Sequence, residues 1–202
     1  MNPTPIALAL SVALMFAAAP GSAQRVVIPD EEAVLQFQRA AQDYAFLHRQ
    51  LERRLAPIEV TANTETLRRA IDTMAAAIRA ARPDARQGDL FVPAVQDVIR
   101  ERIARSLRSH NLTPADVRAA GMAERADRGP VTLQVNGAFP WAAGAAMFTC
   151  ILEALPTLPP ELQYRIVGND LVLIDVHASL IVDLLPYAIG DSEDSLAHGG
   201  GR

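Results

Sequence analysis

The chain contains no lysine, so arginine supplies all 19 of its basic residues. Without a lysine there is no Schiff base to a carbonyl substrate, no lysine of a phosphate-binding P-loop and no Ser–Lys dyad. The chain has a single cysteine, Cys150, which excludes an intramolecular disulfide and a thiolate metal cluster. Apolar neighbours on both sides of Cys150 predict a buried and unreactive thiol.

An excess of positive charge is also missing, because the formal net charge is −4. Binding to nucleic acid needs a clustered excess of basic residues, so this function is not expected. The motifs of serine hydrolases, G-x-G-x-x-G, H-E-x-x-H and C-x-x-C, are absent from the sequence. We therefore expect no cofactor and favour a non-catalytic role over an enzymatic one.

The N-terminus has the features of a secretory signal. Residues 6–19 form an uncharged apolar run, and residues 20–23, Pro-Gly-Ser-Ala, follow it. The run is shorter than the ~20 residues that a membrane-spanning helix needs, so we expect cleavage after Ala23 and a mature chain that begins at Gln24. An uncleaved anchor stays open as an alternative, because the first five residues carry no arginine. The expected location is periplasmic or secreted, with membrane contact only through an uncleaved signal segment.

Three regions are expected along the chain. Residues 1–23 form the signal peptide, residues 24–190 a single mostly helical α+β domain, and residues 191–202 a disordered tail. The tail is polar and rich in glycine, a composition typical of chain ends that do not pack. The central region is long enough to bury its own hydrophobic core.

Apolar residues with helical spacing predict four helices in the first part of this domain. The first is expected over residues 31–55 with Asp30 as its cap, and the second begins with Thr64 as its cap. A third follows, and a fourth begins at Pro114 and is closed by Gly121.

The hydrophobic period changes in the second half of the chain. Alternation of apolar and polar residues predicts a strand over residues 131–135, and a short helix is expected around residues 143–155. Turn signals then separate three short apolar runs, which predict a meander. Its strands are expected over residues 164–167, 171–174 and 180–182. The fold class is therefore α+β, with an N-terminal antiparallel helical hairpin or bundle packed with a small C-terminal antiparallel β-meander.

Two passages carry a family likeness. They are residues 44–52, YAFLHRQLE, and residues 158–183, LPPELQYRIVGNDLVLIDVHASLIVD. Together they resemble a group of secreted bacterial proteins with no assigned function, and the resemblance therefore implies no activity. The meander alone is similar to the C-terminal hairpin of periplasmic nickel/cobalt-homeostasis proteins, which implies a shared β-meander shape.

One candidate polar site lies in the first helix. Tyr44, His48 and Glu52 follow one another at intervals of four residues and share one helix face. A histidine oriented by a carboxylate could act as a base or as a ligand. The alternative, which we favour, is a seam between helices in which His48 hydrogen-bonds to Tyr44 or Glu52 and only packs.

A second candidate lies near the end of the meander, where Asp175 and His177 are two residues apart and share a strand face. They could supply part of a metal site. A complete site needs three or four ligands, and His110 and His198 stand in no recognisable register with this pair. Aspartate is also common at turns for backbone reasons alone. We therefore do not expect a metalloprotein.

These observations favour an exported envelope protein with a non-catalytic binding or accessory role, whose partner is an envelope protein or a small ligand. The alternative is a small periplasmic enzyme or metal-handling protein that uses His48 or the pair of Asp175 and His177. The position of His48 distinguishes the two. Burial in a helical seam favours the first, and a place in a cleft beside a second titratable group favours the second.

Overall fold

The computed structural model describes residues 29–56, 62–123, 131–143 and 147–190. The expected signal segment and tail lie outside these residues. The elements in chain order are α1 (Asp30–Glu52), α2 (Thr64–Ala81), α3 (Pro93–Ser109), α4 (Pro114–Ala123), a 3₁₀ turn (Trp141–Ala143), α5 (Thr149–Ala154), β1 (Leu162–Val167), β2 (Asp170–Asp175) and β3 (Leu180–Leu185). The predicted α+β class is confirmed, with helices first and an antiparallel meander last.

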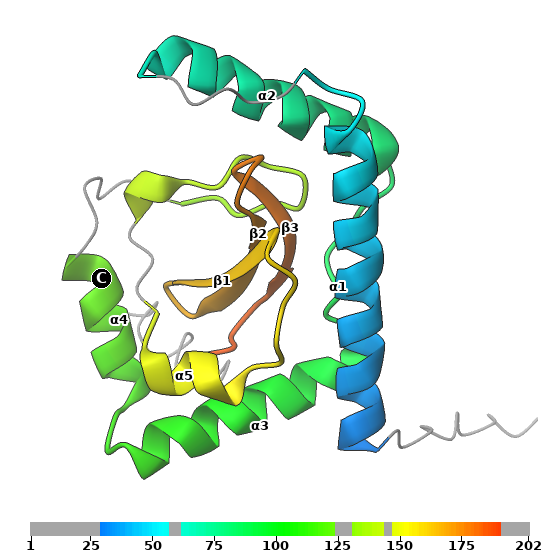
Figure 1. Cartoon of the computed structure of the whole chain (residues 1–202). Helices are drawn as coiled ribbons and strands as arrows, with labels where there is room; N and C mark the ends of the chain where they lie inside the picture. Colours follow the sequence, from blue (N-terminus) through cyan, green and yellow to red (C-terminus); the bar gives the residue numbers. More distant parts are fainter. Residues whose placement is uncertain (1–28, 57–61, 124–130, 144–146, 191–202) are drawn as a thin grey trace, which may run out of the picture.

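The helices lie around the sheet, and their buried residues pack against one of its faces. In Figure 1, α1 runs along one side of the sheet, α2 lies at one end of α1 and α3 at the other. The α1 face that carries Phe37, Tyr44 and His48 is buried. Phe37 stacks on Phe91, with ring centroids 5.3 Å apart, and this contact joins α1 to the segment that leads into α3. None of the described helices has the length and apolar character that a membrane span requires.

Several predicted helix ends are wrong. The cap position of α1 is Pro29, which leaves Asp30 as the first helical residue. The side chain of Asn63, and not that of Thr64, caps α2 by accepting the N–H groups of the following turn. Gly121 lies inside α4 instead of closing it. In each case the helix period is right and the end is displaced by a few residues, because neighbouring residues can serve as caps.

The three strands pair in the order β1-β2-β3, all antiparallel, and the predicted hairpin turn holds at Gly168, whose φ is +64°. The two faces of the sheet belong to different clusters of buried residues. One face, with Leu171 and Leu173, packs into the main core with the helices. The other, with Val172 and Ile174, packs against the segment that precedes α5.

The strand predicted over residues 131–135, which belong to that segment, is wrong. The backbone there forms no strand, and hydrogen bonds to β3 begin only at Asn136 and continue to Phe139. Val135 is nevertheless buried against the second face of the sheet. The alternating apolar residues therefore pack against a face of the sheet and do not form a strand of it. The helix predicted around residues 143–155 is shorter than expected, with only Thr149–Ala154 in α5.

A buried carboxylate in β3 fixes the loop between α2 and α3. Asp183 is fully buried and accepts the backbone N–H groups of Gly88, Leu90, Phe91 and Leu184, each at 2.8 Å. Burial raises the pKa of Asp183, and the four N–H donors act in the opposite direction. Gly88 presents its N–H from a φ of +90°, a conformation that other residues rarely adopt.

We expect Phe37→Ala to lower the free energy of unfolding by about 3–5 kcal/mol, because it removes a fully buried ring from the main core. Urea denaturation followed by circular dichroism measures the loss. Phe46→Ala is the matched control on the same helix, since that side chain is 55% exposed. Equal losses in the two variants would contradict the packing of α1 described above.

Asp183→Asn should cost about 3 kcal/mol, since an amide NH₂ would face backbone N–H donors and leave buried groups unpaired. Thermal or urea unfolding checks this value. The exposed Asp43 on α1 offers the control, Asp43→Asn, which should change stability by less than ~0.5 kcal/mol. If Asp183→Asn also changed the free energy of unfolding by less than ~0.5 kcal/mol, the loop would not depend on this carboxylate.

Candidate functional site

The structure brings all five predicted site residues together. Tyr44, His48 and Glu52 lie on the α1 face that meets the sheet, and Asp175 and His177 lie at the end of β2, where the chain turns into β3. The residues from α1 and those from the end of β2 are more than 120 positions apart in sequence. The sequence analysis treated these residues as two separate candidates, and they form one site.

Asp175 is the centre of the site. Its Oδ2 atom accepts hydrogen bonds from the Tyr44 hydroxyl at 2.8 Å and from Nδ1 of His48 at 2.6 Å. Its Oδ1 atom accepts the backbone N–H groups of His177 and Ala178 at 3.0 and 2.9 Å. A fully buried carboxylate with four donors is held in one orientation.

The expected partner of His48 is therefore wrong, because the ring bonds to Asp175 and not to Tyr44 or Glu52. Because Oδ2 of Asp175 acts as the acceptor in this pair, Nδ1 of His48 carries the proton. In neutral His48 the lone pair then lies on Nε2, which is 3.2 Å from Nδ1 of His177. The side chain of His48 is fully buried, whereas that of His177 is 47% exposed.

The electrostatics of the site favour positive charge at His48. Burial, the largest single influence, lowers the pKa of His48. The hydrogen bond and charge of Asp175, together with the charges of Glu52 and Glu161, act the other way and leave the pKa above its ordinary value. Burial and the neighbouring Asp175 also raise the pKa of the Tyr44 hydroxyl, so it stays a hydrogen-bond donor. The surroundings of His48 therefore favour a positive charge on its ring, and a metal ion at Nε2 would have to displace the proton.

Three side chains of the site could hold a metal ion. One donor atom from each of His48, Glu52 and His177 lies within 4.8 Å of the others. The Glu52 carboxylate is 3.8 Å from Nδ1 of His177, and that nitrogen is 3.2 Å from Nε2 of His48. Two ligands of a tetrahedral zinc ion, each ~2.05 Å from the metal, are ~3.3 Å apart. The spacing of the two imidazole nitrogens thus matches a tetrahedral edge, and the carboxylate lies within 4.8 Å of both.

A pocket opens directly beside these donors. It has a volume of about 530 Å³ and lies between the end of α1 and one side of α2. Glu52 and His177 form its polar end. The position of His48 meets the first criterion of the sequence analysis, because the ring is fully buried and does not itself line the pocket. Its Nε2 atom nevertheless lies 3.2 Å from Nδ1 of His177, which does line the pocket.

Some neighbours of the site gave no signal in the sequence. The guanidinium of Arg82, from the end of α2, lies 5.1 Å from the centre of the Tyr44 ring. Arg49 forms an ion pair with the buried Glu161 at 2.6 Å, next to His48 along α1. Each joins segments distant in sequence, so helical spacing could not indicate it. His110 is exposed at the end of α3, away from this seam, and His198 lies outside the described residues.

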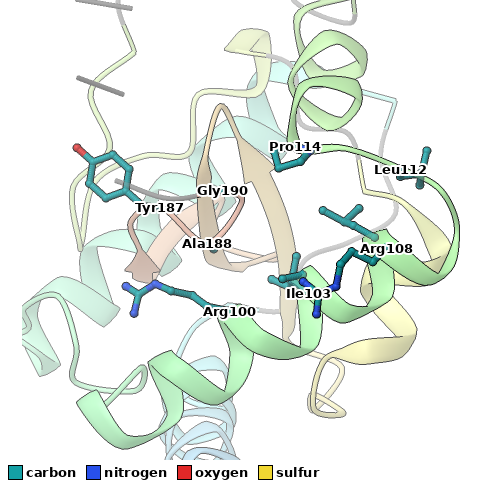
Figure 2. A pocket seen from close by; sticks show the side chains of 10 residues that line it. Arg100, Ile103, Arg108, Leu112, Pro114, Tyr187, Ala188 and Gly190 are labelled. Carbon is teal, nitrogen blue, oxygen red and sulfur yellow. The ribbon is translucent and has the colours of Figure 1, made fainter. Parts of the chain in front are cut away.

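A second pocket, shown in Figure 2, has a different character. Arg100 and Arg108 of α3 lie on either side of Ile103, with Tyr187 and Gly190 across from them. Its volume is about 280 Å³, and its lining contains no histidine or carboxylate. The donor atoms that could bind a metal are therefore found at the first pocket and not at this one.

Comparison of the chain with protein-family models, with curated proteins and with solved structures found no match. The functional argument therefore rests on the geometry of the site.

Tyr44→Phe should lower the free energy of unfolding by about 2 kcal/mol, because it removes a hydrogen bond to a buried, charged Asp175 without changing the ring. Chemical denaturation measures the change. Tyr187→Phe is the control, since the Tyr187 side chain is exposed and only its backbone N–H is bonded. If both variants matched the unaltered protein, the Tyr44–Asp175 bond would not hold α1 to the sheet.

Proposed function

We propose that this protein binds a divalent transition metal such as zinc or nickel, with Nε2 of His48, Nδ1 of His177 and the Glu52 carboxylate as ligands. The observation that carries the proposal is the convergence of these donors beside a histidine whose other nitrogen is fixed by Asp175. Imidazole and carboxylate groups suit both metals. The proposal reverses the preference of the sequence analysis, which considered the two halves of the site separately.

The hydrogen bond from His48 to Asp175 supports this proposal. A histidine that binds a metal usually donates its second N–H to a carboxylate or a carbonyl, which fixes the ring and makes the ligand more basic. Asp175 does this at 2.6 Å and is itself held by Tyr44 and two backbone N–H groups. One imidazole is therefore positioned in advance, and only the exposed Glu52 and His177 need to be ordered when the metal binds.

Three protein ligands leave at least one coordination position free, as in metal sites that bind a further molecule. Because Glu52 and His177 line the pocket, a molecule in the pocket could reach a metal that they hold. We place the protein in the cell envelope, periplasmic or secreted, on the basis of its N-terminal sequence. The proposed role is thus a metal-binding envelope protein with an adjacent small-molecule pocket.

A second candidate function follows from the hydrogen bonds without a metal. If neutral His48 accepts the N–H at Nδ1 of His177, the lone pair of His177 lies on Nε2, where this half-exposed ring borders the pocket. The chain from Asp175 through His48 to His177 would then be a general base. Hydrolytic activity that survives removal of all metal by a chelator and is lost in His48→Gln would favour this enzyme over a metal site.

Isothermal titration calorimetry of the full chain, first stripped with a chelator, tests the metal site. We expect one equivalent of zinc or nickel to bind more tightly than about 1 μM at neutral pH. His177→Ala and Glu52→Gln remove ligands directly. Loss of a residue that hydrogen-bonds to a metal ligand typically weakens metal binding roughly 10–100-fold. Each of these two variants should weaken it by more than that.

His110→Ala is the matched control, because His110 is exposed and remote from the site. This variant should bind the metal as the unaltered protein does. The absence of binding, or binding that His177→Ala leaves unchanged, would contradict the proposed site.

A further inference from the structure

The pocket beside the proposed metal site has the size and lining of a site for an organic molecule. Its volume of about 530 Å³ falls within the range of roughly 300–1,000 Å³ typical of small-molecule sites. One end is polar, with Glu52, Arg53 and His177. The remaining wall is formed by aliphatic and hydroxyl-bearing side chains, namely Leu55, Ala56, Thr66, Ala70, Thr73 and Met74.

The charge at the polar end depends on the metal. Without a metal, Glu52 and Arg53 balance each other. A bound divalent cation would leave the lining with an excess positive charge, since the charges of Glu52 and Arg53 already cancel. Arg53 forms no ion pair within the described part of the chain, and its guanidinium is free to bind an anion. The metal-loaded pocket therefore favours a negatively charged group.

The rest of the pocket favours an apolar body. Leu55, Ala70 and Met74 present aliphatic surface, and the Thr73 hydroxyl already donates to the Arg69 carbonyl at 2.7 Å. Burial of a methylene group stabilises a complex by about 0.8 kcal/mol. A ligand with a short hydrocarbon chain would thus match this wall.

We propose that this pocket binds a small organic carboxylate, whose carboxylate completes the coordination of the metal and pairs with Arg53 and whose aliphatic chain lies against Leu55, Ala70 and Met74. This inference rests on the proposed metal site. Because the same carboxylate contacts metal and protein, each ligand strengthens the binding of the other. Carboxylate binding is accordingly weak in the metal-free protein.

The test uses the full chain loaded with cobalt(II), whose visible absorption reports its coordination, and hexanoate as the probe. Hexanoate should change the cobalt spectrum in a saturable way and bind roughly 15-fold more tightly than butanoate, about fourfold for each of the two added methylene groups. Hexanol, which has the same chain and no charge, should leave the spectrum unchanged. Metal-free protein should show at least tenfold weaker hexanoate binding by calorimetry, following the usual size of such coupling.

Two variants separate the pocket from the metal site. Arg53→Ala should weaken hexanoate binding at least about tenfold, the usual effect of losing a charge-assisted hydrogen bond. Arg54→Ala, a neighbouring exposed arginine that does not line the pocket, is the matched control. Ala70→Phe fills the pocket and should abolish the hexanoate response while zinc binding remains.

The outcomes keep the two proposals apart. Cobalt and zinc that bind stoichiometrically while hexanoate leaves the spectrum unchanged would overturn the carboxylate site and leave the metal site standing. Hexanoate that binds equally well with and without metal, or hexanol that binds as tightly as hexanoate, would also overturn it. Failure of the metals themselves to bind would overturn the metal site and, with it, this inference.

Discussion

The buried carboxylate of Asp175 is the constraint on which the other contacts of the site depend. Isolated in the core it would be strongly unfavourable, so the surrounding chain must deliver donors to it. Tyr44 and His48 deliver two from α1, and the turn after β2 delivers two from its own backbone. Meeting this requirement fixes how α1 lies against the end of the sheet and sets the rotamer of His48.

The sheet positions the helices with a second buried carboxylate in the same manner. Asp183 in β3 binds the backbone that connects α2 to α3, while Asp175 in β2 binds α1. The meander is small, yet its two aspartates bond to α1 and to the loop between α2 and α3. Figure 1 shows these three helices around the sheet. The pocket lies between the end of α1 and α2, so its shape depends on the hydrogen bonds of Asp175 and Asp183 that position these helices.

The sequence predicted the parts of this fold that depend on local spacing. Apolar periods of a helix and a hairpin turn at Gly168 follow from steric rules along a few residues, and both were found. The pairing of His48 with Asp175 spans 127 positions, and no local rule relates them. Asp175 does accept backbone N–H groups at a turn through Oδ1, as aspartates commonly do. This common role gave no indication that Oδ2 bonds to Tyr44 and His48. The site residues were thus predictable individually, but their assembly was not.

The direction of the hydrogen bonds gives a physical reason to regard the site as more than a structural anchor. A network that only held α1 in place could end at a buried hydrogen-bond donor to Nε2 of His48. Here Nε2 instead faces His177, whose ring is half-exposed and borders the pocket beside Glu52. The network therefore runs from a buried core to exposed polar groups at a surface. Sites that must hold a ligand accurately are built in this way, with the inner donor fixed by packing and the outer ones free to close around what binds.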